Sequence, residues 1–320
     1  MLLRHAQLFC EVCARRSFSA AARVLSVSQP TVSAAVSQIE KDLGVALLDR
    51  SSRPLVVTPA GQIYETGCRS LLRQIAELEE NVRAAGDRLA GTIRVAAIYS
   101  VGLLEIRTLV AEFEASHPDV HVEIEYCHPD EVYERLRTGR AELGLVAFAQ
   151  PTEEFDATLW QRQTMAAIVP PEHPLARRKS IRLRDLAGER FVTLKPGLTT
   201  RSHLDRLFAE RQVTVESVGQ FDNFDTLRRA VVEGDGLSIV PSAIFQTDAR
   251  MGLVRLLPIH DPGGRADPDL VRPLGIVTRS GETAGAAATA FREALLTMPG
   301  RETGPEAATT RIPEPLSTAV

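Results

Sequence analysis

The 320-residue sequence contains few cysteines and no long apolar run. Its four cysteines are too few and too scattered for a disulfide framework, and a reducing cytosol is their natural compartment. No run of about 18 apolar residues is present to span a membrane, and the first five residues, MLLRH, lack the apolar stretch of a signal peptide. We therefore expect a cytoplasmic protein with no membrane partner.

Motifs of catalysis and metal binding are also missing. The sequence has no nucleophile elbow, no phosphate-binding or dinucleotide-binding glycine loop and no H-E-x-x-H zinc motif. Cys10 and Cys13 form a C-x-x-C pair that is compatible with zinc or redox chemistry. No second pair follows and both lie on an apolar helix face, so core packing is favoured. We expect no enzymatic activity, no metal and no cofactor.

The net charge is unevenly distributed along the chain, because acidic residues are sparser in the first 60 residues than in the rest. The formal net charge is −4, yet the first 60 residues hold seven Lys or Arg against four Asp or Glu, so this segment carries +3 and the remainder −7. A weakly basic head on an acidic body fits a nucleic-acid contact at the N-terminal end, which a dimer would double.

Residues 17–53 indicate two helices joined by a tight turn. Ser17 or Ser19 begins the first helix, and Ser28 or Gln29 caps the second, with Pro30 in its first turn, where a missing N–H costs nothing. Apolar residues recur at helical spacing along the inner face of the second helix: Val32, Val36, Ile39 and Leu43.

The opposite face of the second helix is small, neutral and rich in hydrogen-bonding groups. It consists of Gln29, Thr31, Ser33, Ala34, Ser37 and Gln38. The alternative is an ordinary helical hairpin with a solvated face, but such a face usually carries Lys and Glu. A small polar face suits a helix that reads base edges in a major groove, as in a helix-turn-helix.

This segment resembles the N-terminal domain of LysR-type transcriptional regulators. The resemblance rests on Ala21-Ala22 and the run SVSQPTVS at residues 26–33, and it continues through a wing at residues 43–50 and 57–61. It implies a winged helix-turn-helix over residues 1–58 that binds double-stranded promoter DNA. The residues expected to contact DNA are Gln29, Pro30, Thr31, Ser33, Ala34, Gln38, Arg50 and Arg53.

Base readout is assigned to Gln29, Thr31 and Ser33, with Arg50 directed toward phosphate and Arg53 toward the minor groove. The family often has Arg and Gln after the Ser33 position, where this chain has Ala34 and Ala35. Specificity should therefore depend heavily on Gln29 and Ser33.

A long helix is expected over residues 59–90. Its apolar residues alternate steps of four and three, which is a heptad seam: Tyr64, Cys68, Leu71, Ile75, Leu78, Val82, Ala85 and Leu89. The seam predicts a homodimerisation helix, and the alternative is an amphipathic helix packed on its own domain. The family resemblance implies the same linker role and suggests a homotetramer.

Residues 91–298 alternate strands and helices, which predicts an α/β body with a parallel sheet. This region resembles the effector-binding domain of LysR-type regulators, a two-lobed fold similar to periplasmic solute-binding proteins. The resemblance places lobe I at about 92–163 and 270–298 and lobe II at about 164–269. Gly144 departs from the Asp often found there. The Pro-, Thr- and Ala-rich tail, residues 299–320, is expected to be flexible.

A small-molecule site is expected in the cleft between the lobes, where strands end and helices begin. The candidate residues are Ser100, His128, Phe148, Thr199, Thr200, Arg201 and Asn223. Helix capping by the Ser, Thr and Asn residues, a loop position for His128 and core packing for Phe148 are the alternatives. Hydroxyls, backbone amides and a cation at helix starts favour a carboxylate or an oxyanion.

The sequence thus predicts a cytoplasmic, LysR-like DNA-binding regulator controlled by an anionic effector, with RNA polymerase as a further candidate partner. An enzyme and a transport-type solute-binding protein are the competing classes. The missing catalytic motifs count against the enzyme, and the N-terminal head and missing signal peptide count against the transport protein.

Overall fold

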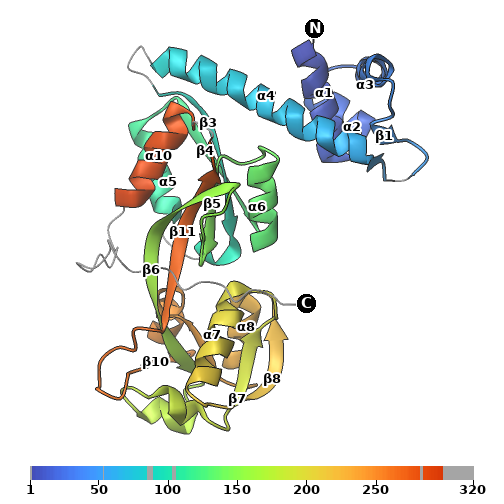
Figure 1. Cartoon of the computed structure of the whole chain (residues 1–320). Helices are drawn as coiled ribbons and strands as arrows, with labels where there is room; N and C mark the ends of the chain where they lie inside the picture. The colour runs from blue at the N-terminus through green and yellow to red at the C-terminus, as the bar shows by residue number, and fades with distance from the viewer. Residues whose placement is uncertain (1, 53, 85–88, 103–105, 282–283, 298–320) are drawn as a thin grey trace.

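The computed structural model describes residues 2–297 except 53, 85–88, 103–105 and 282–283. A small helical head is joined by one long helix to two α/β lobes, and the lobes are stacked in an elongated arrangement (Figure 1). Among the described residues, no helix combines the length and apolar character needed to cross a lipid bilayer.

The head contains helices α1 (Leu2–Arg15), α2 (Phe18–Val24) and α3 (Gln29–Leu43) and an antiparallel wing of β1 (Leu48–Asp49) and β2 (Val56–Val57). Ser17 and Ser28 are the N-caps, since their hydroxyls accept the backbone N–H of Ala20 and Thr31. The inner face of α3 is formed by Val32, Ala35, Val36 and Ile39. The expected inner residue Leu43 is instead 50% exposed, because α3 ends there at Gly44.

Helix α4 (Pro59–Ala84) follows the wing and runs over lobe I (Figure 1). The expected seam does not lie on one free face. Tyr64 and Cys68 pack against α1. Leu71, Leu78 and Val82 are 58%, 62% and 68% exposed. Ala85 lies outside the described residues, and Leu89 follows the helix and packs on lobe I.

Lobe I is built on β3 (Gly91–Ile98), β4 (Val120–Cys127) and β5 (Leu143–Ala147), with α5 (Ile106–Ser116), α6 (Pro129–Arg137) and α10 (Ala286–Thr297) around them. β3 pairs parallel with β4 and β5, as predicted. The sheet is nevertheless mixed, because β11 (Val271–Arg279) pairs antiparallel with β5. A short 3₁₀ turn, Tyr99–Val101, follows β3, so Ser100 does not open α5.

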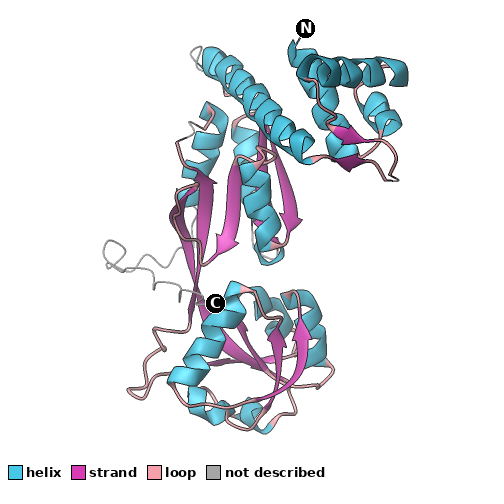
Figure 2. Cartoon of the chain, turned by 45° about the vertical axis from the view of Figure 1, so that its right-hand side comes forward, coloured by secondary structure: helices cyan, strands magenta, loops and turns pink. Residues whose placement is uncertain are grey.

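Lobe II contains β7 (Arg190–Leu194), α7 (Thr199–Glu210), β8 (Glu216–Phe221), α8 (Phe224–Val232), β9 (Ser238–Pro241), α9 (Gln246–Arg250) and β10 (Arg255–Pro258). β6 (Phe155–Val169) is shared between the lobes: it pairs with β11 up to Thr164 and with β9 and β10 beyond it. β6 and β11, labelled in Figure 1, cross between the lobes, and Figure 2 shows the same connection from another side. Residues 166–169, which belong to lobe II, form the end of β6.

Candidate functional site

The outward face of α3 carries the residues expected to read DNA. Gln29, Pro30, Thr31, Ala34 and Gln38 are exposed, and Ser33 is half-buried. The hydroxyl of Thr31 hydrogen bonds to that of Ser28 at 2.7 Å, and the Gln38 amide donates to Asp42 at 2.6 Å. Gln29 makes no side-chain hydrogen bond to the described part of the chain, so its amide is available to a partner.

Arg50 is fixed between the wing and α3. Its Nη2 donates to Ser37 at 3.1 Å and to Glu40 at 2.8 Å, and its guanidinium lies 5.2 Å from the Phe18 ring centroid. Glu40 also accepts the backbone N–H groups of Leu47 and Leu48. Glu40 therefore holds the wing against α3 through these hydrogen bonds. The sequence does not reveal this role, because Glu40 lies in a polar stretch near the end of the helix. Arg53 lies outside the described residues.

A cavity of about 50 Å³ lies between the two lobes. Five of the seven predicted effector residues line it: Ser100, His128, Thr199, Thr200 and Asn223. Apolar groups of Ile98, Ala147, Leu194, Leu198 and Phe224 complete much of the wall. Ser100 and His128 come from lobe I and the other three from lobe II, so the structure brings the two sets together as predicted.

Arg272 of β11 is the central residue of this cavity, and the sequence analysis missed it. Its side chain is buried, with 2% exposure. Nε donates to the Thr200 hydroxyl at 3.1 Å, Nη1 to Gln163 Oε1 at 2.6 Å and Nη2 to the Ser100 hydroxyl at 2.8 Å. The guanidinium also lies 5.4 Å from the Phe224 ring centroid.

The charge of Arg272 has no carboxylate partner among the described residues. Burial lowers the pKa of its guanidinium to about 9, so the group is still cationic at neutral pH. Its three side-chain partners are neutral. The lobes therefore enclose a positive charge that their own side chains hydrogen bond but do not neutralise.

The surrounding polar groups present further donors. Ser100 and Thr200 accept from Arg272 with their oxygens, so each hydroxyl proton can be donated elsewhere. Gln163 is buried and accepts through Oε1, while its Nε2 has no hydrogen-bond partner among the described residues. Two hydroxyl donors and one cation thus line the same cavity, which is suited to an anion.

Of the residues for which helix capping was the alternative role, Asn223 caps a helix and the two threonines do not. The N-cap of α7 is Leu198, so neither Thr199 nor Thr200 caps that helix. Asn223 does cap α8, because its Oδ1 accepts the Thr226 N–H at 2.9 Å. His128 is the N-cap residue of α6 but makes no side-chain capping bond, and its Nδ1 lies 3.4 Å from Asp130.

Phe148 and Arg201 do not line the cavity. Arg201 turns into lobe II, where it pairs with Asp205 and donates to Thr193 and to the Leu194 carbonyl. Phe148 packs on His203 of lobe II with ring centroids 4.9 Å apart. Burial lowers the pKa of His203, which favours its neutral form in this contact. Phe148 is thus an inter-lobe packing residue.

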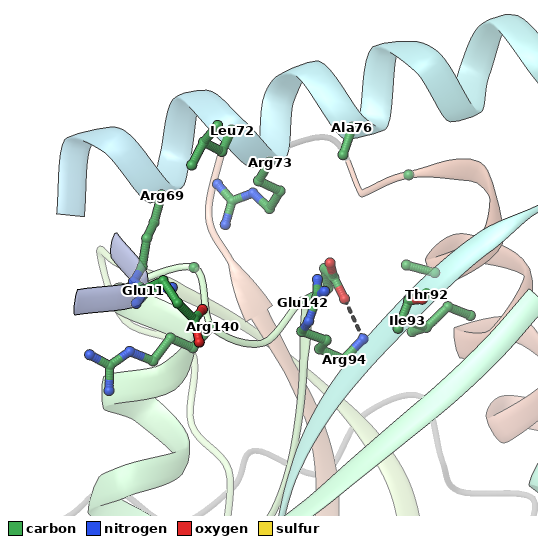
Figure 3. Close-up of a pocket in the computed structure, with 13 residues that line it drawn as sticks. Glu11, Arg69, Leu72, Arg73, Ala76, Thr92, Ile93, Arg94, Arg140 and Glu142 are labelled. Carbon is green, nitrogen blue, oxygen red and sulfur yellow. Dashed lines mark hydrogen bonds between the residues drawn. The ribbon is translucent and has the colours of Figure 1, made fainter. Parts of the chain in front are cut away.

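A second cavity, of about 540 Å³, lies where the head, α4 and lobe I meet (Figure 3). Arg69 and Arg73 approach it from α4, and Arg94, Arg140 and Glu142 from lobe I. Glu142 accepts the backbone N–H of Arg94, and burial raises the pKa of its carboxyl. Beside this cavity, the buried Glu65 of α4 accepts from both Arg69 and Arg140 at 2.9 Å.

The comparisons with known proteins agree with this architecture. Residues 3–62 match the family model described as bacterial regulatory helix-turn-helix protein, lysR family, and residues 86–299 match the LysR substrate binding domain. The RuBisCO operon transcriptional regulator of Allochromatium vinosum is 29% identical, and the match covers 93% of this chain and 97% of that protein. The HTH-type transcriptional regulator CysL of Bacillus subtilis is 27% identical, and the match covers 79% of this chain and 85% of that protein. A full-length OxyR structure from Pseudomonas aeruginosa has a TM-score of 0.74, with 23% identity, 92% of this chain and 93% of that chain covered.

Proposed function

The chain belongs to the LysR family of DNA-binding transcriptional regulators, and from that premise we propose that its effector is a small anion bound at Arg272 between the two lobes. Like the transcriptional regulators it matches, it combines a DNA-binding domain with an effector-binding domain and is not an enzyme.

The unneutralised charge of Arg272 is the observation that carries the proposal. Burying a cation without a counter-charge costs several kcal/mol, and a bound carboxylate or oxyanion would offset that cost. The Ser100 and Thr200 hydroxyls line the same cavity as Arg272 and can donate to an anion bound there. A neutral effector would leave the charge of the guanidinium uncompensated, and a cationic effector would place a second positive charge beside it.

The size of the cavity restricts the effector in this arrangement. A volume of about 50 Å³ has room for a few water molecules, so any larger ligand requires the lobes to separate. Apolar residues from both lobes face the anion-binding groups. We therefore infer a small carboxylate with a short apolar part, or an inorganic oxyanion.

Direct binding to the full-length protein tests this proposal. Calorimetry with a panel of small carboxylates and inorganic oxyanions, each carboxylate matched by its amide, should give heat of binding for at least one anion and for no amide. Arg272→Gln should weaken that binding by about ten- to a hundredfold, since a hydrogen bond to a charged group contributes about 1.5–3 kcal/mol.

Arg201→Gln is the matched control for Arg272→Gln. Arg201 neighbours Thr200 in sequence but donates into lobe II, so its replacement should leave anion binding within about twofold of wild type. Equal losses in the two variants, or amides that bind as well as their acids, would contradict an anion site at Arg272.

For DNA, we propose that α3 enters the major groove and that Gln29, Thr31 and Ser33 read base edges. Pro30, Ala34 and Gln38 would contact the same groove, Arg50 a phosphate and Arg53 the minor groove. The exposed, neutral face of α3 and the fixed orientation of Arg50 support these assignments. The regulator would act in the cytoplasm, where bacterial promoter DNA lies, and RNA polymerase is a further proposed partner.

We also propose a homodimer through the exposed apolar residues of α4, and a homotetramer of two such dimers. Exposed Leu71, Leu78 and Val82 support the dimer, because a contiguous apolar stripe on a long helix is otherwise left in water. The proposed parts are a DNA-binding domain at residues 1–58, a linker at 59–90 and an effector domain at 91–298. Residues 299–320 lie outside the described part of the chain.

A further inference from the structure

Cys10 of α1 and Cys68 of α4 meet where the head joins the long helix. Together with Ala6 they form a small buried cluster, with Tyr64 and Leu72 packed against it. This cluster is separate from the main core of the head, which contains Cys13. The C-x-x-C spacing of Cys10 and Cys13 in the sequence is therefore not the pairing that the fold brings together.

The two thiols differ in acidity because of their immediate surroundings. Hydrogen bonds from Cys10 and from the Tyr64 hydroxyl, together with the charge of Arg69, outweigh burial and lower the pKa of Cys68 to about 7. The hydrogen bond with Cys68 and burial raise the pKa of Cys10. Cys68 is consequently the nucleophilic thiolate of the pair, and Cys10 is the thiol beside it.

We propose that Cys10 and Cys68 form a reversible, redox-controlled cross-link between α1 and α4. The proposal rests on the packing of two thiols from different helices in one cluster. Both are buried, so the oxidant is a small molecule, namely hydrogen peroxide or another small hydroperoxide. Nothing in the effector site takes part in this chemistry.

The reaction proceeds in two steps. The Cys68 thiolate attacks one peroxide oxygen, the O–O bond breaks, and the products are a Cys68 sulfenic acid and hydroxide. The Cys10 sulfur then attacks the Cys68 sulfur and displaces the sulfenic hydroxyl, and the departing hydroxide takes the Cys10 proton and leaves as water. Both sulfurs are oxidised by one electron each, and the peroxide is reduced. A dithiol reductant reverses the cross-link.

The cross-link would restrict the joint that relates the DNA-binding head to the effector domain. The Cys10 sulfur lies 4.0 Å from the Glu65 carbonyl oxygen, and Arg69 donates to the Cys10 carbonyl at 2.9 Å. The Glu65 carboxylate in turn accepts from Arg140 of lobe I. A disulfide between α1 and α4 would therefore form next to Glu65, the residue through which lobe I contacts α4. It would limit movement of the head relative to lobe I.

The other two cysteines should remain reduced. Burial raises the pKa of Cys13, which lies in the main core of the head, and that of Cys127, which lies in the core of lobe I. Neither belongs to the Cys10–Cys68 cluster. Oxidation of the native protein should therefore consume two of the four thiols.

The test is to treat the native full-length protein with a small excess of hydrogen peroxide, block remaining thiols and map disulfides by non-reducing peptide mass spectrometry. We expect a peptide pair joined through Cys10 and Cys68, lost after dithiothreitol. Fluorescence anisotropy with DNA from upstream of its gene should show that oxidation changes Kd about fivefold or more, reversibly.

Variants make the experiment specific. Cys13→Ala, a buried cysteine one turn away on the same helix, should retain both the cross-link and the change in Kd. Cys68→Ala should lose both, and DNA binding of its reduced form shows that it is folded. A different disulfide, thiols that react only after unfolding, or a Kd unchanged by cross-linking would overturn the proposal.

Discussion

Arg272 illustrates how a single buried residue defines the chemistry of a site. Its N–H groups are satisfied by Ser100, Gln163 and Thr200, but all three partners are neutral. Because hydrogen bonding and charge neutralisation are separate requirements for a buried ion, the first can be met while the second is not. The result is a positive potential directed at the space between the lobes.

The Ser100 and Thr200 hydroxyls, which accept from Arg272, are expected to contribute directly to anion binding. Ser100→Val and Thr200→Val should each weaken anion binding by about tenfold or more, because each removes a donor to a charged group. Each variant should lose about 1–3 kcal/mol of folding stability, because an N–H group of the buried Arg272 loses its acceptor, but DNA affinity without the anion should stay near wild type. Calorimetry and promoter output with and without the anion measure both effects, and an unchanged response in both variants would show that the effector binds elsewhere.

Gln29 is the residue on which recognition of the DNA sequence is expected to depend most. Gln29→Ala should cost about 1–3 kcal/mol on the cognate site and much less on random DNA, because a base contact is lost while phosphate contacts remain. Gln62→Ala, at an exposed glutamine on α4, is the matched control. It should change the affinity for neither the cognate site nor random DNA. Equal losses on cognate and random DNA would refute base readout by Gln29.

The residues differ in how far their roles could be predicted from sequence. Thr31, Ala34 and Gln38 recur at helical spacing, so local periodicity was enough to place them on one exposed face of α3. Arg272 has partners 72, 109 and 172 residues away, and no local pattern connects them. The available signal was Arg272 near the start of a mostly apolar strand, where an unpaired charge is costly.

At the scale of elements, α4 divides its apolar residues between two surfaces. The residues near its start pack on α1, whereas Leu71, Leu78 and Val82 are exposed. The heptad spacing predicted the helix and its apolar character. It could not reveal this division, because the spacing is the same whether the neighbour is α1 or another copy of α4. Only the tertiary placement of α1 separates the two surfaces.

The exposed surface of α4 leads to a prediction about assembly. Replacing Leu71 and Leu78 together by Glu should dissociate the dimer, because like charges would face each other along the apolar stripe. Sequence-specific DNA binding should fall with it, since two half-sites are held together only when the heads are tethered.

Light scattering and anisotropy provide the measurements for this variant. Ala76→Glu, on the other side of α4 beside the cavity shown in Figure 3, is the control and should leave the protein dimeric. A double variant that stayed dimeric would assign the exposed stripe to a different partner.

At the scale of the whole molecule, the head and the effector site lie at a distance from one another, with α4 and lobe I between them (Figure 1). β6 and β11 cross between the lobes, and Arg272 sits on one of these strands. A ligand that changes the lobe arrangement therefore acts on the same strands that hold its binding residue. Its effect can reach DNA only through differential affinity for two arrangements.

The most direct test of the account is the Kd of the full-length protein for DNA from upstream of its gene, measured with and without the small carboxylate or oxyanion that binds best in the calorimetric panel. We predict that the anion changes the wild-type Kd about fivefold or more and changes that of Arg272→Gln by less than about twofold. The same change in both proteins would contradict an anion-responsive regulator whose effector is held by Arg272.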